Sequence, residues 1–78
     1  DGPSGVSTVA QTPPVQLTDR EVDVLRLIAK GYKASEVAQL LTLSSHTVTG
    51  YVRDIYRKLG ISSRAEATLE AARRGLVT

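Results

Sequence analysis

The sequence predicts an all-α protein: a compact four-helix domain that contains a helix-turn-helix and is preceded by a flexible linker. Apolar residues recur every three or four positions over residues 17–77, and no stretch alternates apolar and polar residues as a half-buried strand does. Three of the four helical runs begin at Thr or Ser and end at a glycine, and these residue types are favoured at helix starts and ends.

The chain has 78 residues and therefore holds one small domain. A folded part of about 60 residues buries only about 60% of the surface that its unfolded chain exposes, so its stability is marginal. The sequence has no cysteine, which excludes disulfides and thiolate zinc sites. It has a single histidine and no cluster of carboxylates, so we expect neither a metal nor another cofactor.

Residues 1–16 predict a flexible linker, and residues 17–78 predict the domain. The first segment is rich in Gly, Pro, Ser, Thr and Gln and lacks sustained apolar periodicity. Because the chain contains no methionine, we expect a fragment whose linker leads to a missing N-terminal domain. No apolar run reaches the about 20 residues of a membrane span, and the N-terminus does not resemble a signal peptide, so we expect a cytoplasmic protein without membrane contact.

The first helix is predicted to begin after Thr18. Thr18 and Glu21 have the spacing of a capping box, in which each side chain bonds the backbone N–H of the other residue. Leu17 precedes the cap and can pack on the first turns. Gly31 is placed to adopt the left-handed conformation that ends the helix. The inward face is formed by Val22, Leu25, Ile28 and Ala29.

A short second helix is predicted over residues 34–41, with Val37, Ala38 and Leu41 facing inward. Its start is poorly capped, because Lys33 stands where Ser or Thr is favoured. Leu43 then fills a turn, and Ser44 caps the next helix. This succession of helix, turn and helix is the reason for expecting a helix-turn-helix.

The helix predicted over residues 45–59 has two chemically different faces. At about 100° per residue, one stripe is apolar and holds Val48, Val52, Ile55 and Leu59. The opposite side is small or cationic and holds His46, Thr49, Gly50, Arg53 and Arg57. An apolar stripe that fixes a helix to a core, with slim and basic residues facing outward, favours insertion into the major groove of DNA.

The last helix is predicted over residues 63–74, with Ser63 and Glu66 as a second capping box and Gly75 at its end. Ala67 and Ala71 form its inward face. A second apolar stripe consists of Ala65, Leu69 and Ala72. A helix with two apolar faces buries one against its own core and offers the other elsewhere. We therefore expect a weak homodimer through this stripe.

From Leu17 to Leu76 the chain resembles the LuxR/GerE-type helix-turn-helix, the four-helix output domain of many bacterial transcription regulators. The matching motifs are Leu17-Thr18-x-Arg20-Glu21, Val24-Leu25, Ile28-Ala29-x-Gly31, Glu36-Val37-Ala38, Ser44-x-x-Thr47-Val48, Ile55-x-x-Lys58-Leu59-Gly60 and Arg64-x-x-Ala67. The resemblance implies a double-stranded DNA operator with two half-sites, bound by a dimer that pairs through the fourth helix. It also implies a missing receiver or sensor domain before the linker, and it allows RNA polymerase as a further partner.

The resemblance and the helix geometry together predict a DNA-binding site for transcription regulation. Arg53, Thr49 and Gly50 are expected to read bases; Arg53 matches a basic family position, and Gly50 lets the backbone approach the DNA closely. The residues expected at phosphates lie at the start of helix 45–59, in its last turns and beside it: Lys33, Ser45, His46, Thr47, Tyr51, Arg57 and Lys58.

Two alternatives stay open at this point. Region 4 of a sigma factor has a similar opening and reading helix, but such factors commonly end soon after the reader, whereas this chain continues into a fourth helix. A protein-interaction module would instead use the patch around Leu69. An enzyme is not expected, since the sequence supplies no plausible catalytic set.

Overall fold

A computed structural model describes residues 16–77 of the chain. These residues form helices α2 (Asp19–Ala29), α3 (Ala34–Leu41), α4 (Ser45–Leu59) and α5 (Arg64–Arg73), and no strand. The all-α, four-helix prediction is thereby confirmed for this part of the chain. The predicted linker lies outside the described residues except for Gln16. None of the described helices is long and apolar enough to cross a membrane.

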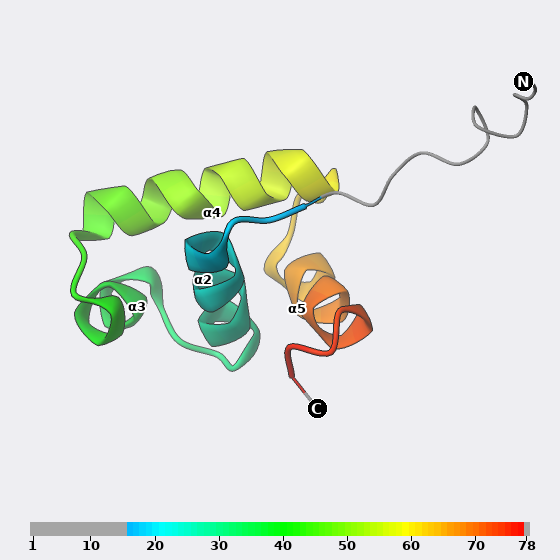
Figure 1. The fold of residues 1–78 in the computed structure, drawn as a ribbon, viewed down its shortest axis with the longest axis horizontal. Coiled ribbons are helices and arrows are strands. Elements are labelled where there is room, and N and C mark those ends of the chain that lie inside the picture. Colours follow the sequence, from blue (N-terminus) through cyan, green and yellow to red (C-terminus); the bar gives the residue numbers. More distant parts are fainter. Residues whose placement is uncertain (1–15, 78) are drawn as a thin grey trace, which may run out of the picture.

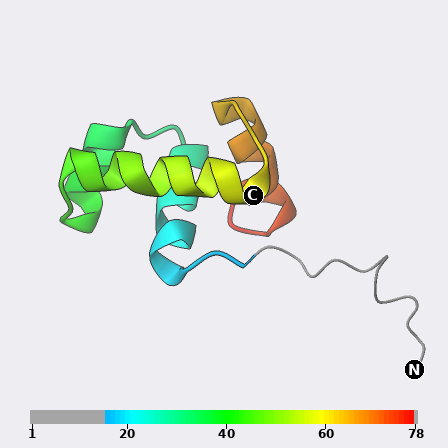
Figure 2. The same cartoon turned by 90° about the horizontal axis from the view of Figure 1, so that it is seen from above.

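Helix α2 occupies the centre of the arrangement, because it packs against α3, α4 and α5. Figure 1 shows α4 along one side of the domain, with α3, α2 and α5 beneath it. In Figure 2, which is turned by 90°, α4 lies nearest to the viewer and the other helices lie behind it. One long side of α4 is therefore turned away from the rest of the domain.

The core is formed by apolar side chains from all four helices. Its buried members are Val24, Leu25, Ile28, Val37, Ala38, Val48, Ile55, Ala67 and Ala71. The inward face predicted for α2 was too narrow: Val24 is fully buried, whereas Val22 is only half-buried. A central helix has neighbours on more than one side, so its buried surface is wider than a single stripe.

The predicted capping box opens α2. The Glu21 N–H donates to the Thr18 hydroxyl at 3.2 Å, and the Thr18 N–H donates to Glu21 Oε1 at 2.9 Å. Gly31 follows the helix with a φ of +105°, a region that favours glycine. Both signals in the sequence are confirmed.

The end of α3 was not foreseen. Thr42 follows the helix in the left-handed conformation, with φ +59° and ψ +46°. Its N–H donates to the carbonyl of Gln39, and the Leu43 N–H returns to the Ala38 carbonyl at 2.8 Å. A β-branched residue rarely adopts this conformation, so Thr42 holds a strained position between the two helices of the helix-turn-helix.

The start of α5 differs from the predicted capping box. Ser63 is the N-cap, and its hydroxyl accepts from the Glu66 N–H at 3.2 Å. The Glu66 carboxylate, however, accepts from the Ser62 N–H at 3.2 Å rather than from the N–H of Ser63. It therefore reaches one residue further back and fixes the connection that leads out of α4.

Arg64, the first residue of α5, joins that helix to the end of α2. Its guanidinium donates to the Ile28 carbonyl at 3.2 Å and also to the Tyr32 carbonyl. The last carbonyls of a helix lack partners within the helix and carry a partial negative charge, which a cation complements. This contact supplements the packing of Ala67 and Ala71, which are fully buried.

Candidate nucleic-acid interface

The side of α4 that faces away from the domain carries the side chains that the sequence assigned to it. Val48 and Ile55 are buried and hold α4 to the core. The outer face of α4 consists of His46, Thr49, Gly50, Arg53 and Arg57; its four side chains are exposed and Gly50 is half-exposed. The structure thus brings together the three predicted base-reading residues on one outward surface.

Gly50 lies in the middle of this face and is not required there by the fold. A Cβ built on its backbone meets no atom within 4 Å. Its backbone is helical, so the residue does not serve a left-handed turn. Glycine in a helix interior costs about 1 kcal/mol relative to alanine. Neither packing nor backbone conformation explains why glycine, which makes the helix less stable than alanine would, stands at position 50.

Thr49 uses its hydroxyl proton within the helix. Its Oγ1 donates to the Ser45 carbonyl at 3.0 Å. The oxygen lone pairs and the methyl group remain available for contacts outside the domain. An apolar contact through the methyl group therefore fits this arrangement better than donation of the hydroxyl proton to a phosphate.

The start of α4 is an ordered, exposed group of polar side chains. Ser44 is the N-cap: its hydroxyl accepts from the Thr47 N–H at 3.1 Å and donates to the Thr47 hydroxyl at 2.8 Å. With these bonds made, the Thr47 hydroxyl proton has no partner in the cap. Ser45 and His46 are exposed beside it, in the first turn, where helix N–H groups lack acceptors within the helix.

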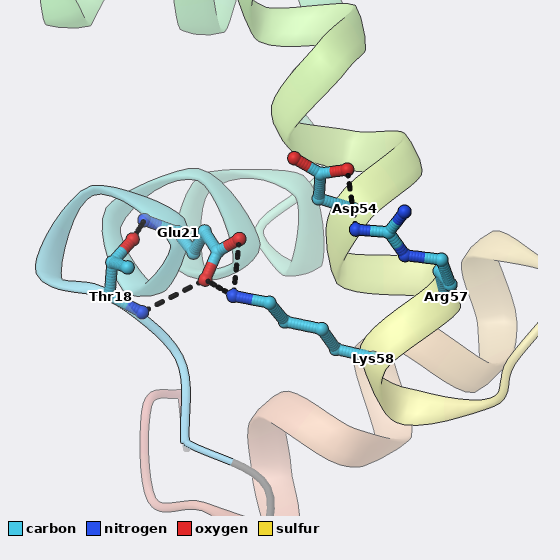
Figure 3. A network of polar contacts seen from close by, with 5 residues as sticks. All are labelled: Thr18, Glu21, Asp54, Arg57 and Lys58. Carbon is cyan, nitrogen blue, oxygen red and sulfur yellow. Dashed lines mark hydrogen bonds and ion pairs between the residues drawn. The ribbon is translucent and has the colours of Figure 1, made fainter.

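The two arginines of the outer face differ in their surroundings. Within residues 16–77, no hydrogen bond or ion pair holds the side chain of Arg53. Arg57, whose side chain is 75% exposed, donates to Asp54 Oδ1 at 3.1 Å (Figure 3). An exposed pair of this kind contributes about 0–1 kcal/mol, so it restrains the guanidinium only weakly.

Lys58 has a role that the sequence did not indicate. Its ammonium donates to both carboxylate oxygens of Glu21, at 2.8 Å and 3.1 Å. Glu21 is 3% exposed and is the one charged side chain among the buried residues described, while the Lys58 side chain is 33% exposed. Figure 3 shows the two side chains meeting between the first turn of α2 and the last turn of α4. The phosphate contact predicted for Lys58 stays a prediction.

The protonation of Glu21 reflects this contact. Burial works to raise the pKa of the Glu21 carboxyl, but the hydrogen bond from Lys58 and the backbone N–H of Thr18 outweigh it, and the pKa lies below its ordinary value. Glu66 behaves similarly: the Ser62 N–H and the Ser63 hydroxyl stabilise its charged form and lower the pKa of its carboxyl. Both groups are therefore carboxylates at neutral pH.

The remaining predicted residues lie around α4 and on α5. Lys33 is exposed at the start of α3, where its N–H donates to Glu36 Oε1 at 2.8 Å. Tyr51 is half-buried and packs against the core. On α5, Ala65 and Ala72 are exposed and Leu69 is 54% exposed, which matches the second apolar stripe. In residues 16–77 no three His, Cys, Asp or Glu side chains gather as metal ligands.

Comparisons with known proteins agree with this arrangement. The family described as bacterial regulatory proteins, luxR family, matches residues 15–71, which is well over half of the chain. The transcriptional regulatory protein YdfI of Bacillus subtilis (strain 168) is 44% identical over 68 residues, covering 87% of this chain and 32% of that protein. The nitrate/nitrite response regulator protein NarP of Escherichia coli (strain K12) is 42% identical over 53 residues, covering 68% of this chain and 25% of that protein.

The fold has a solved counterpart as well. The structure of the transcription factor GerE superimposes with a TM-score of 0.70 at 32% sequence identity, covering 80% of this chain and 92% of that one. The chain spans about a third or less of the curated relatives above. The family match decides against the sigma-factor alternative, and the family is one of DNA-binding regulators rather than of enzymes. The chain belongs to the luxR family of bacterial regulatory proteins, and its four helices are a DNA-binding helix-turn-helix domain for transcription regulation.

Proposed function

We propose that α4 enters the major groove of an operator and reads its bases from the outer face. The observation that carries this proposal is that this face combines the Arg53 guanidinium, which has no partner among residues 16–77, with Gly50, whose missing side chain the fold does not need. When a helix enters the major groove, the residues that face the bases must either be small or be able to contact the base edges. The domain acts by binding, and we assign it no catalytic step.

Three residues are assigned to the bases. Arg53 is unpaired within the described chain and can donate two hydrogen bonds to O6 and N7 of a guanine. Thr49, whose hydroxyl proton is engaged with Ser45, offers its methyl group to a thymine methyl. Gly50 lets the helix backbone lie close to the base edges.

Further residues are assigned to phosphates, which set register rather than sequence preference. Thr47 offers a hydroxyl proton, and the first-turn amides near Ser45 and His46 offer the positive end of the helix dipole. Arg57 and Lys33 supply exposed cations on either side of the face. Tyr51 contributes its hydroxyl. Two of the three ammonium protons of Lys58 donate to Glu21, and we assign the third to a phosphate.

Pairing of two copies is assigned to α5. Leu69 is 54% exposed, and Ala65 and Ala72 are exposed on the same side of the helix. The patch is small, so we expect a weak homodimer that forms on DNA and matches two half-sites related by a two-fold axis. Residues 1–16 link the domain to a receiver or sensor domain in the longer protein, RNA polymerase is a further partner, and the site of action is the cytoplasm.

The proposal is tested by selecting bound duplexes from a randomised pool with the wild type and with Arg53→Ala. We expect the wild type to enrich a two-fold-related motif and Arg53→Ala to lose enrichment at one base position, worth about 1–3 kcal/mol of discrimination. Arg26→Ala is the matched control, because Arg26 is an arginine on α2 that pairs with Asp23. Steep salt dependence without any motif would reduce the function to nonspecific phosphate attraction.

A further inference from the structure

We propose that Glu21 is a positioning residue for DNA reading: through Lys58 it sets the rotation of α4 about its own axis and so aims Arg53 at the bases. The inference rests on the proposed function of α4. It assigns sequence discrimination to a buried carboxylate that does not face the DNA.

Apolar packing restrains the rotation of α4 only loosely. Val48 and Ile55 are buried, but the other two members of the stripe, Val52 and Leu59, are only half-buried, as is the neighbouring Tyr51. Hydrophobic contact is non-directional and roughly proportional to buried area. The half-buried side chains can gain or lose contact as the helix turns, so apolar packing restrains rotation less sharply than a directional contact does.

The contact between Glu21 and Lys58 is directional. Both oxygens of the carboxylate lie within hydrogen-bond distance of the ammonium, at 2.8 Å and 3.1 Å. Charge-assisted hydrogen bonds of this length weaken steeply when the distance or the angle changes. Lys58 lies in the last turn of α4, so rotation of the helix that carries Lys58 away from Glu21 lengthens the contact.

The carboxylate is itself held firmly. Its Oε1 also accepts the Thr18 N–H at 2.9 Å, and the Glu21 backbone is bonded in turn to the Thr18 hydroxyl. With 3% of Glu21 exposed, water competes little for these bonds. The anchor therefore moves with the first turn of α2, the helix at the centre of the domain.

The distances involved decide whether rotation matters for reading. Side chains lie about 6 Å from a helix axis, so a rotation of about 20° displaces them by about 2 Å. The side chains of a binding site must lie within about 0.5 Å and 10–20° of the geometry that makes their contacts. Arg53 is five residues before Lys58 on the same rigid helix, so loss of the anchor misplaces its guanidinium relative to the base edges.

The test compares Glu21→Gln with the wild type. A glutamine keeps an oxygen for the Thr18 N–H, so the cap survives while the charge pair is lost. The measured quantity is the Kd for a duplex changed at the base that Arg53 reads, divided by the Kd for the selected duplex, at a temperature where circular dichroism shows each protein folded. We expect the ratio to fall about tenfold, in line with the loss of one bidentate base contact.

Arg64→Gln is the matched control, because it removes a charged tie between α5 and α2 that does not involve α4. It should lower Tm and leave the Kd ratio unchanged. If Glu21→Gln does not fold, Lys58→Met gives the same comparison from the other partner. Lys58→Arg should restore discrimination relative to Lys58→Met, since a guanidinium can again donate hydrogen bonds to both oxygens of the Glu21 carboxylate.

The outcomes separate the two ideas. If Arg53→Ala loses discrimination while folded Glu21→Gln or Lys58→Met keeps it, the proposed function stands and Glu21 is only a source of stability. If the wild type itself has no base preference, the proposed function fails and the positioning role fails with it. A reduced Kd ratio in Glu21→Gln but not in Arg64→Gln supports the inference.

Discussion

Asp54 holds Arg57 on the outer side of α4, with the guanidinium 3.1 Å from Oδ1. Asp54 is the one acidic residue of this 15-residue helix, whose other ionisable groups include two arginines and a lysine. A carboxylate at this place repels DNA phosphates and also occupies a cation that could bind them. We therefore expect Asp54, chiefly through its own charge, to lower the affinity of the domain for DNA in general.

Removing that carboxylate should strengthen nonspecific binding. For Asp54→Asn we expect an increase of roughly fivefold in affinity for a non-cognate duplex, for about 1 kcal/mol of exposed charge interaction. The slope of log K against log salt should steepen by about one phosphate contact. Fluorescence anisotropy at two salt concentrations measures both. Asp23→Asn is the control, since Asp23 also pairs with arginines but lies on α2. An equal increase in affinity for the non-cognate duplex in this variant would show that Asp54 has no special role.

Gly50→Ala should separate folding from binding. The added Cβ meets nothing within the domain, so the free energy of unfolding should rise by about 1 kcal/mol. Affinity for the selected duplex should fall, because the methyl group enters the space between helix and bases. Urea unfolding and a DNA titration on the same sample check the two signs. Affinity that rises or stays constant would contradict close approach at Gly50.

Thr42→Gly should stabilise the domain. A non-glycine residue in the left-handed region costs about 1–3 kcal/mol, and glycine relieves most of that strain despite its larger entropy in the unfolded chain. We expect the unfolding free energy to increase by about 1 kcal/mol. Thr68→Gly, a change in the interior of α5, should instead destabilise by about 0.5 kcal/mol or more. Equal effects at both positions would mean that the backbone of Thr42 is not strained.

Acid should destabilise the domain through Glu21 and Glu66. Both carboxyls have a pKa in the folded protein below the ordinary value, so the unfolded chain binds protons more readily than the folded one. Their contribution is complete above the ordinary glutamate pKa and is lost as the pH falls through and below it. Urea unfolding between about pH 7 and pH 3 should show this decline. In Glu21→Gln the decline should be shallower, and an unchanged pH profile would contradict the assignment.

Leu69→Glu should abolish cooperative binding to two half-sites. The substitution places a charge in the centre of the exposed patch of α5, where a second copy is expected to dock. Binding to a single half-site should stay the same, because α4 is untouched. Gel-shift titrations on duplexes with one and two half-sites measure the difference, and Leu69→Met is the apolar control. If both variants behave alike, the patch does not pair two copies.

The local structure could be predicted from the sequence, because its signals lie within a few residues of each other. Helices α3 and α4 have the predicted bounds, and Thr18, Ser44 and Ser63 are the caps that the sequence indicated. The outer face of α4 followed from helical periodicity alone. For α5 the predicted range 63–74 was one residue too long at each end, since Ser63 and Arg74 flank the helix.

Contacts between distant residues could not be predicted in this way. Glu21 and Lys58 are separated by 37 positions, and Arg64 lies 36 positions from Ile28. No periodicity connects such pairs; only the packing of α4 and α5 on α2 brings them together. Thr42 was missed for another reason, because its residue type argues against the conformation that the connection to α4 imposes on it.

The bonds from Arg64 to the end of α2 bear on how the domain is made in the cell. A ribosome completes α2 first and α5 last of the described helices, yet the buried surface of α2 needs Ala67 and Ala71 to cover it. Until residues 64–71 have emerged, the side of α2 that packs against α5 stays uncovered in the newly made chain, where chaperones and proteases can reach it. We therefore expect a chain that ends before α5 to be degraded rather than to persist as a weaker DNA binder.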